Sequence, residues 1–333
     1  MRILIFGAGA IGSVVGGFMA KAGHAVTLVG RQPHMDAIRE RGLRITGIWG
    51  EHAVTTLETR TRIEHRDMFA ARIAAIARFA TDDGFEELKE GGYDLVLVTV
   101  KSYDTRAAAK AIHLVAPPDT LVCSYQNGLG NVETLAEVLP PKQVFGARAI
   151  YGAWLPEPGH ADVTVIANPT ALGTYHPATP VERVLEIATA MNDAGLPTEY
   201  AENIATVLWS KVAYNCAMNP LSALLDVPYG GLLDSEYTKD IMRDVVRELY
   251  AVAQAMKVIL DPATPEAYIE LLFNVLIPPT AEHYASMRED IRRHKRTEID
   301  ALNGAICRYA ENLGIPCPTN TTLTRLIRAR EQR

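Results

Sequence analysis

The chain begins with apolar runs separated by a glycine-containing turn. Residues 3–6 are continuously apolar, which is typical of a strand buried on both faces of a parallel sheet. Residues 7–12 (GAGAIG) follow directly, and apolar side chains then recur at helical spacing between Ile11 and Met19. After a short turn, residues 25–29 form a second apolar run. The pattern predicts a strand, a glycine turn, a helix and a strand in succession.

The alternation of strands and helices continues to residue 125 and predicts a parallel sheet, and the pattern changes beyond Gly146. Residues 43–56 are predicted to form a hairpin, and residues 162–166 and 171–175 are predicted as short antiparallel strands. The further predicted strands are residues 94–100, 120–125 and 197–201, and the further predicted helices are residues 33–41, 103–115 and 181–194.

From Asn203 onward the pattern is helical. Apolar residues recur every three or four positions in residues 241–256, and Ser235 is a suitable N-cap for this amphipathic helix. We predict a Rossmann-type α/β dinucleotide-binding domain in residues 1–200, followed by an all-helical domain in residues 201–333. Further helices in that second domain are predicted near residues 264–276, 280–313 and 320–330.

Composition narrows the class of protein. The 333 residues carry a formal net charge of −6, whereas dedicated nucleic-acid binders usually have a strong basic excess. The 4 cysteines are widely spaced, which argues against a zinc site or a disulfide framework and favours the reducing cytoplasm. Residues 3–20 are uncharged and as long as a short membrane span, but their glycines favour the strand and helix. We therefore expect neither nucleic acid nor a membrane as partner.

The glycine turn carries the first candidate chemistry. Gly7 permits a tight turn, Gly9 leaves room for a pyrophosphate beside the backbone, and Gly12 lets the helix pack close to the strand. The N–H groups at the start of the helix then face the phosphates. The alternative is a flexible glycine-rich N-terminus, and the flanking strand and helix argue against it.

The end of the second strand indicates which dinucleotide binds. NAD-binding proteins usually place Asp or Glu there, where the carboxylate binds the ribose 2′-hydroxyl group. This chain has Val29-Gly30-Arg31 instead, and the planar guanidinium of Arg31 suits a 2′-phosphate. We therefore favour NADP(H) over NAD(H), with an ordinary surface charge as the alternative for Arg31.

Polar residues follow two further strands and occupy one stripe of a predicted helix. Lys101 and Asn127 lie at the expected carboxyl ends of strands, where ligands bind in such sheets, although each also suits a surface or turn position. Lys211, Asn215 and Asn219 are spaced i, i+4 and i+8 on a mostly apolar helix. Buried polar groups need partners, which either a polar substrate or the neighbouring backbone would supply.

The C-terminal part adds a basic run and an acidic candidate. Residues 292–296 (RRHKR) fit a solvated face, and Glu298 either points inward beside Ile299 or pairs with a basic neighbour one turn away. The 9 histidines show no spacing typical of a metal site, and no Gly-x-Ser-x-Gly nucleophile motif occurs. We therefore expect no metal centre.

Taken together, these residues resemble the ketopantoate reductase (2-dehydropantoate 2-reductase) family, and the likeness extends over nearly the whole chain. Members of this family reduce ketopantoate to pantoate, a precursor of pantothenate and coenzyme A. The shared features are Gly7-Ala8-Gly9-Ala10-Ile11-Gly12, Arg31, Val100-Lys101, Asn127-Gly128-Leu129-Gly130, Lys211-x-x-x-Asn215-x-x-x-Asn219-Pro220, Ser286-Met287, and Arg296-Thr297-Glu298-Ile299-Asp300 with Asn303-Gly304.

The resemblance implies an NADPH-dependent enzyme that acts on a small 2-oxo acid. Asn127 would touch both cofactor and substrate, Lys211 would be the general acid, and Glu298 would bridge the cofactor and the catalytic centre. The substrate's carboxylate and hydroxyl groups would be held by Asn215, Asn219 and Ser286. NADPH would be bound by Gly7, Ala8, Gly9, Ala10, Ile11, Gly12, Arg31 and Lys101.

Two departures from the family leave the substrate open. Tyr229, in Pro228-Tyr229-Gly230, stands where the family often has an asparagine that contacts the substrate. Residues 57–92 are longer than the corresponding family loop, and the apolar residues of this segment that fit one helix face are Met68, Phe69, Ile73 and Ile76. The alternatives are a reductase of another branched or bulky 2-oxo acid and, less favoured, a non-catalytic NADP-sensing protein. We expect a cytoplasmic protein, and a homodimer is one option for its assembly.

Overall fold

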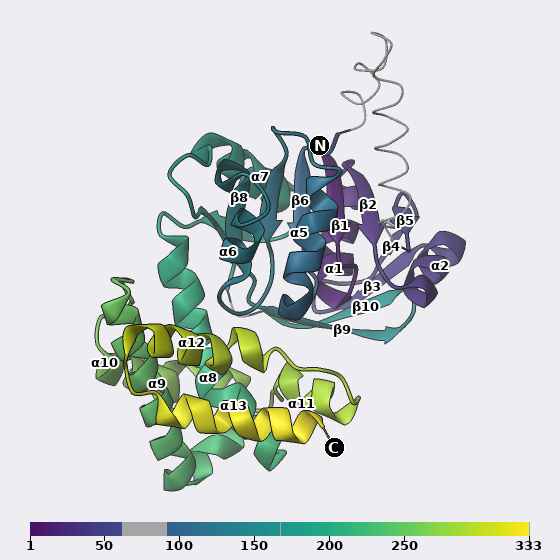
Figure 1. Cartoon of the computed structure of the whole chain (residues 1–333). Helices are drawn as coiled ribbons and strands as arrows, with labels where there is room; N and C mark the ends of the chain where they lie inside the picture. Colours follow the sequence, from purple (N-terminus) through teal and green to yellow (C-terminus); the bar gives the residue numbers. More distant parts are fainter. Residues whose placement is uncertain (62–91, 167, 333) are drawn as a thin grey trace. The chain divides into compact units, whose positions relative to one another are not determined.

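The computed structural model describes residues 1–61, 92–166 and 168–332. The chain divides into two compact units, one made of Met1–Gln126 with Asn131–Ile204 and the other of Asn127–Gly130 with Ala205–Arg333. The first unit contains strands and helices and the second is helical (Figure 1), which confirms the predicted fold class. The four-residue loop that starts at Asn127 groups with the helical unit, although the chain on both sides of it belongs to the other unit.

One large sheet organises the first unit. Its strands lie in the spatial order β12 (Thr198–Tyr200), β11 (Thr170–Thr174), β8 (Val144–Arg148), β7 (Leu121–Ser124), β6 (Leu95–Val98), β1 (Arg2–Phe6), β2 (Ala25–Val29) and β5 (Glu58–Arg60). Neighbouring strands are parallel except β8 and β11. The carboxyl ends of β1, β2, β6 and β7 therefore meet at one edge. The sequence pattern does not predict β5 or β8, and the helix predicted after β5 lies outside the described residues.

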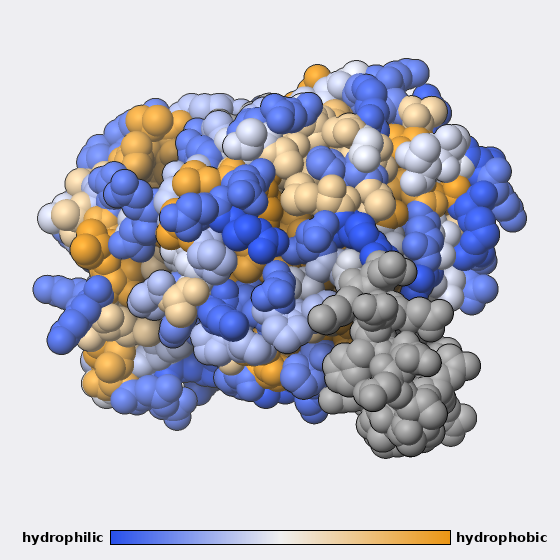
Figure 2. All heavy atoms as spheres, turned by 90° about the horizontal axis from the view of Figure 1, so that it is seen from above, coloured by the Kyte–Doolittle hydropathy of each residue, from blue (hydrophilic) through white to orange (hydrophobic). Residues whose placement is uncertain are grey.

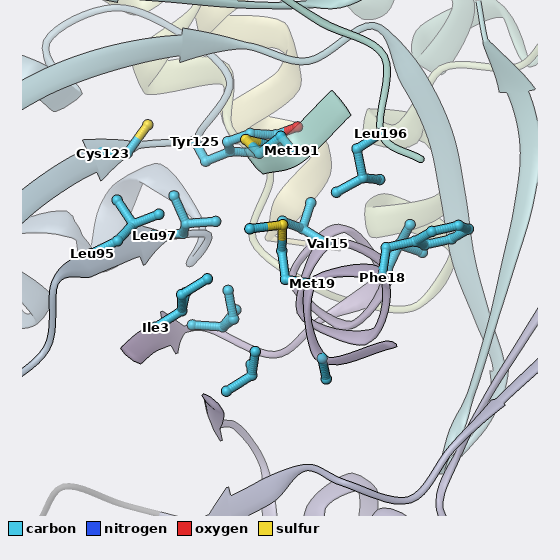
Figure 3. Close-up of a cluster of buried hydrophobic side chains, with 14 of the residues drawn as sticks. Ile3, Val15, Phe18, Met19, Leu95, Leu97, Cys123, Tyr125, Met191 and Leu196 are labelled. Atoms are coloured by element: carbon cyan, nitrogen blue, oxygen red, sulfur yellow. The ribbon is translucent and has the colours of Figure 1, made fainter. Parts of the chain in front are cut away.

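Side chains of the central strands alternate between two apolar layers. Ile3, Leu95 and Leu97 pack with Val15 of α1 (Ala10–Lys21) and Met191 of α7 (Val181–Asp193), as Figure 3 shows. The residues between them are equally buried and face the opposite layer, which contains two helices. Because both faces are covered, these strands are continuously apolar. The helices of the opposite layer are α5 (Thr105–His113) and α6 (Asn131–Ala136).

A second, smaller sheet packs on the outer side of α1. Its spatial order is β4 (His52–Val54), β3 (Leu43–Gly47), β10 (His160–Ile166) and β9 (Tyr151–Glu157). Strands β3 and β4 form the predicted hairpin. The two predicted antiparallel strands also form, as β10 and β11, but they lie in different sheets, because β10 is antiparallel to β9 and β11 is antiparallel to β8. Helix α2 (Gln32–Arg41) follows β2 as predicted.

The position of α1 between the two sheets explains two glycines without a phosphate-binding role. A Cβ atom on Gly16 would lie 2.6 Å from a Leu28 methyl group of β2, and one on Gly17 would lie 2.5 Å from a methyl group of Ile45 in β3. Larger residues at these positions would push the helix away from one sheet or the other. Part of the glycine content of residues 3–20 is therefore a packing requirement.

The second unit consists of helices joined by short turns. Its helices are α8 (Ile204–Leu225), α9 (Glu236–Ala255), α10 (Pro265–Leu271), α11 (Ser286–Arg292), α12 (Asn303–Leu313) and α13 (Pro318–Glu331). The prediction of one helix over residues 280–313 is wrong, because α11 and α12 are separate. His294 has a φ of 51°, and the N–H of Lys295 donates to the carbonyl of Asp290 at 2.8 Å, so that α11 ends before this point. The break leaves Glu298 in non-helical chain between the two helices.

Helix α8 continues through an internal proline. Pro220 has no N–H group and therefore cannot bond to the carbonyl of Cys216, one turn earlier. The side-chain amide of Asn303 donates to this Cys216 oxygen at 3.1 Å. Asn303 is itself fully buried, and its amide also donates to Asn320 Oδ1 at 3.0 Å. A side chain of α12 thus supplies the hydrogen bond that the proline removes from α8.

The exposed surface shows no single apolar face in the view of Figure 2, where apolar and polar side chains mix in small patches. Exposed large apolar residues such as Tyr237 and Ile259 are ordinary on a protein surface when they are scattered. Within residues 1–61, 92–166 and 168–332, no helix combines the length and the apolarity that are needed to cross a membrane.

We predict that Asn303→Ala lowers the free energy of unfolding by about 1–3 kcal/mol, because it leaves the buried carbonyl of Cys216 without a donor. Chemical denaturation measures this change. Asn274→Ala is the matched control, since the Asn274 amide donates to the Glu270 carboxylate at an exposed position. The control should change the free energy of unfolding by less than about 0.5 kcal/mol. Equal losses in the two variants would contradict the role of Asn303.

Candidate active site

The turn after β1 is held in place by backbone hydrogen bonds and by a glycine. The N–H groups of Gly7 and Ala8 donate to the carbonyl of Val29, at 3.0 and 2.7 Å. Gly7 has a φ of 117°, and a Cβ atom on it would lie 2.5 Å from the backbone nitrogen of Val100. Only glycine meets both conditions. The turn after β1 is therefore fixed against the ends of β2 and β6.

The other two glycines of the turn have different surroundings. A Cβ atom on Gly12 would lie 2.6 Å from Thr99 Oγ1 and 2.7 Å from the carbonyl of Gly7, so helix α1 can approach β1 only with glycine there. A Cβ atom on Gly9 would come no closer than 3.9 Å to its nearest neighbour, the Gly7 carbonyl. Packing within the described protein therefore does not require Gly9 to be glycine, whereas a ligand lying against the backbone would.

The start of α1 is suited to an anion. Gly9 is its N-cap residue, no side chain caps the helix, and its first turn contains no acidic residue. The first N–H groups of a helix have no intrahelical acceptor, and they attract phosphate oxygens. This open N-terminus and the space beside Gly9 fit the pyrophosphate of a dinucleotide.

Two basic residues follow β2 and β6, the strands on either side of β1, at the same edge of the sheet. Arg31 is exposed and is the N-cap of α2, directly after β2, and Lys101 is partly buried after β6. Gln126 begins the polar segment at the end of β7, and the sequence assigned it no role of its own. Its side-chain amide donates to Val100 O at 2.9 Å and to Thr105 Oγ1 at 2.8 Å. Gln126 thus ties the segment after β7 to the segment after β6.

In the second unit, the predicted lysine and the predicted loop asparagine meet. Lys211 Nζ donates to Asn127 Oδ1 at 2.6 Å. Lys211 is half-buried on α8, and the loop that carries Asn127 is held by a hydrogen bond from Leu129 N to Ala301 O at 2.8 Å. Gly128 permits this approach, since its φ is 90° and a Cβ atom would lie 2.6 Å from the Ala301 oxygen. The ammonium group of Lys211 is therefore oriented by the Asn127 loop, which is far from Lys211 in the sequence.

All four residues predicted to bind the substrate line one pocket in this unit. It is lined by Asn127, Asn215, Asn219, Ser286, Met287, Asp290, Glu298 and Leu302. Lys211 is not among the lining residues, although its ammonium group bonds to Asn127, which is one of them. The sequence assigned no role to Asp290, which lies four residues after Ser286 on α11. Residues at this spacing share a helix face, so the spacing is the signal for Asp290.

Two asparagines of this pocket are nearly buried and have spare hydrogen-bonding groups. Asn215 is 8% exposed and Asn219 is 5% exposed. Within the described chain, the Asn215 side chain forms no hydrogen bond, and Asn219 forms one through its oxygen, to Tyr229. Buried polar groups without partners are costly. Both amides therefore fit a bound polar molecule better than a structural role.

Two further expectations from the sequence concern the basic run and a metal site. Residues 292–296 are exposed, as predicted for a solvated face. Among the residues that the structure describes, no group of three or more His, Cys, Asp or Glu side chains is arranged to hold a metal ion.

Comparisons with known proteins decide the family. The model for ketopantoate reductase PanE/ApbA matches residues 3–177, and the model for the C-terminal part of the same family matches residues 203–331. The chain belongs to the ketopantoate reductase family. A 2-dehydropantoate 2-reductase of Pyrococcus horikoshii is 37% identical to this family member over 331 residues, which cover 99% of this chain and 98% of the relative.

Solved structures of ketopantoate reductases and related dehydrogenases share the fold. A PanE/ApbA family ketopantoate reductase from Ralstonia eutropha is 33% identical, with a TM-score of 0.83 and coverage of 100% of this chain and 99% of its own. A D-mandelate dehydrogenase, solved with NADH and anilino(oxo)acetate, is 25% identical, with a TM-score of 0.84 and coverage of 100% and 98%.

We predict that Gly9→Ala, in the turn after β1, and Gly12→Ala, in the first turns of α1, affect different properties of the protein. Gly9→Ala should leave the free energy of unfolding within about 0.5 kcal/mol and weaken dinucleotide binding about tenfold or more, because its methyl group points into open space. Gly12→Ala should lower the free energy of unfolding by about 1–3 kcal/mol, because its methyl group overlaps Thr99 and Gly7. Thermal unfolding and titration with NADPH separate the two effects. Tight binding by the Gly9 variant would contradict the assignment of the pyrophosphate site.

Proposed function

We propose that this protein reduces ketopantoate to pantoate with NADPH, in the supply of pantothenate and coenzyme A. Membership of the ketopantoate reductase family supports the reaction class, as do full-length relatives that are named 2-dehydropantoate 2-reductase. The observation that carries the proposal is the hydrogen bond between Lys211 and Asn127 beside a pocket lined by two nearly buried asparagines. A proton donor next to amide donors suits a ketone that bears a carboxylate.

The roles of the substrate residues follow from the charge that reduction creates. When bound, the nicotinamide supplies a hydride ion. Negative charge then grows on the keto oxygen, and Lys211 stabilises this charge and donates a proton to it. Asn127 orients the ammonium group through its side-chain oxygen. Asn215, Asn219 and Ser286 donate to the substrate's carboxylate and hydroxyl oxygens, and Glu298 lies beside them in the pocket lining.

We assign the dinucleotide to the first unit and the 2-oxo acid to the second, in line with the predicted domains of residues 1–200 and 201–333. The open space beside Gly9 and the uncapped start of α1 support a pyrophosphate site, with Lys101 as a further contact. Arg31 favours NADPH, since it stands at the end of β2 and can bind a 2′-phosphate. The free thiols of Cys123, Cys216, Cys307 and Cys317 agree with the cytoplasm as location.

A second candidate function is the reduction of another bulky 2-oxo acid. The structural relative that is named D-mandelate dehydrogenase favours it, because anilino(oxo)acetate in that structure carries an aromatic group next to an oxo acid. Tyr229 also replaces the asparagine that the family often has at this position. A comparison of kcat/KM for ketopantoate, aliphatic 2-oxo acids and an aryl 2-oxo acid, each with NADPH and NADH, distinguishes the two functions. Brisk turnover of another acid with negligible turnover of ketopantoate would overturn our first assignment.

We predict that Lys211→Ala lowers kcat about 100- to 10,000-fold with the preferred 2-oxo acid, because the keto oxygen loses its proton donor. Steady-state kinetics at saturating cofactor measures this effect. Lys239→Ala is the control, since Lys239 forms an ion pair with Glu236 on the outside of α9. It should leave kcat within about twofold. Unchanged turnover in the Lys211 variant would remove Lys211 from the mechanism.

We also predict that Arg31→Ala raises KM for NADPH about tenfold or more, while KM for NADH stays within about twofold. The reason is that only NADPH carries the 2′-phosphate, and a hydrogen bond to a charged group is stronger than a neutral one. The control is Arg39→Ala on the same helix, because Arg39 pairs with Asp36. If the Arg31 variant weakened both cofactors equally, the proposed preference for NADPH would have no basis in Arg31.

A further inference from the structure

The side chain of Tyr229 is held rigidly behind the pocket. It is 4% exposed and lies just before the short helix η4 (Gly230–Asp234). The N–H groups of Tyr229 and Gly230 donate to His283 O at 2.9 Å and to Ala281 O at 2.8 Å. The Tyr229 ring meets the Tyr214 ring edge-on, with 5.9 Å between centroids, and the His283 ring at 5.4 Å. Backbone and ring contacts together fix where its hydroxyl group lies.

The hydroxyl group of Tyr229 determines how the amide of Asn219 is turned. It donates to Asn219 Oδ1 at 2.7 Å, and within the described chain this oxygen is its acceptor. Burial raises the pKa of Tyr229 far above its ordinary value, and nearby Tyr214 adds to the shift, so the hydroxyl group remains a proton donor. If the amide turned over, the hydroxyl oxygen would accept from the NH₂ group, but the hydroxyl hydrogen would lose the acceptor that it has within the described chain. A buried donor without an acceptor is unfavourable.

The orientation matters because the two ends of an amide have opposite hydrogen-bonding character. Asn219 lines the pocket, and its oxygen is already engaged by Tyr229. Its NH₂ group is therefore the end left for a ligand. An NH₂ group donates to the carboxylate or keto oxygen of a 2-oxo acid, whereas an amide oxygen would repel either one.

We infer that Tyr229 is a positioning residue that holds the Asn219 amide with its NH₂ group available to an oxygen of the 2-oxo acid. The inference rests on the proposed function. Tyr229 is not among the described residues that line the pocket. Its influence on the substrate therefore passes through Asn219. Tyr229 thereby makes Asn219 selective for acceptor groups, and it does so without reducing the space in the pocket.

A double-mutant cycle tests this coupling. Tyr229→Phe keeps the ring contacts and removes only the hydroxyl group. It should raise KM for the 2-oxo acid about five- to tenfold and leave kcat and KM for the cofactor within about twofold, as expected for loss of uniform substrate binding. In an Asn219→Ala background the same change should alter KM by less than about twofold, because the group through which Tyr229 acts is absent. Independent, multiplying effects would overturn the inference.

The control is Tyr250→Phe, which also removes a buried hydroxyl group in the second unit. Tyr250 donates to the backbone oxygen of Pro262 at 2.8 Å and does not contact Asn219 through a hydrogen bond in the described chain. It should lower thermal stability about as much as Tyr229→Phe and leave KM within about twofold. A similar rise in KM in this control would mean that the Tyr229 effect is merely structural.

A spectroscopic measurement keeps the inference testable even if the proposed function fails. The side-chain amide signals of Asn219 in protein labelled with ¹⁵N-asparagine are assigned by their loss in Asn219→Ala. In Tyr229→Phe these signals should shift or broaden, while those of Asn320, held by Val245 and Glu248, stay in place. Unchanged Asn219 signals would refute the positioning role. If the wild-type protein turns over no 2-oxo acid, the proposed function fails, and the signals still decide the role of Tyr229.

Discussion

A helix that is buried over most of its surface cannot carry polar groups without partners, and the second unit is arranged around this constraint on α8. Asn303 supplies the hydrogen bond that Pro220 takes from Cys216. Asn127 accepts from Lys211, and Tyr229 donates to the oxygen of Asn219. Asn215 and the NH₂ group of Asn219, which these contacts do not engage, lie at a pocket. The same requirement that stabilises the helix therefore indicates where a polar ligand binds.

A steric constraint plays the corresponding part in the first unit. At Gly12, Gly16 and Gly17 an added methyl group would collide with neighbouring strands, so α1 approaches both sheets only through glycine. Gly9 differs, because the space beside it is open. One glycine-rich stretch thus combines residues that serve packing with a residue that serves a ligand. The space around each glycine distinguishes the two roles, whereas the shared motif does not.

The periodic elements were predictable because local spacing determines them. The buried strands β1, β6 and β7 are continuous apolar runs, and α9 has apolar residues every three to four positions. Where the prediction was wrong, at residues 280–313, backbone hydrogen bonds around His294 separate two helices, and the spacing of residues does not reveal these bonds. Three of the four strands of the second sheet were predicted, but β9 was not. The pairing of β10 with β3, more than 100 residues earlier in the chain, was not predicted either.

The sequence by itself determined the α/β and helical fold class, the glycine turn and the stripe of Lys211, Asn215 and Asn219 on one helix, because each depends on neighbours within a few residues. Only the tertiary structure decided which groups meet. It brought Asn127 to Lys211 and added Asp290 to the pocket. It also placed Tyr229 behind Asn219, at a position where the family often has an asparagine that contacts the substrate. The physical reason is that hydrogen-bond partners are selected by distance and direction in space, and chain order does not record either one.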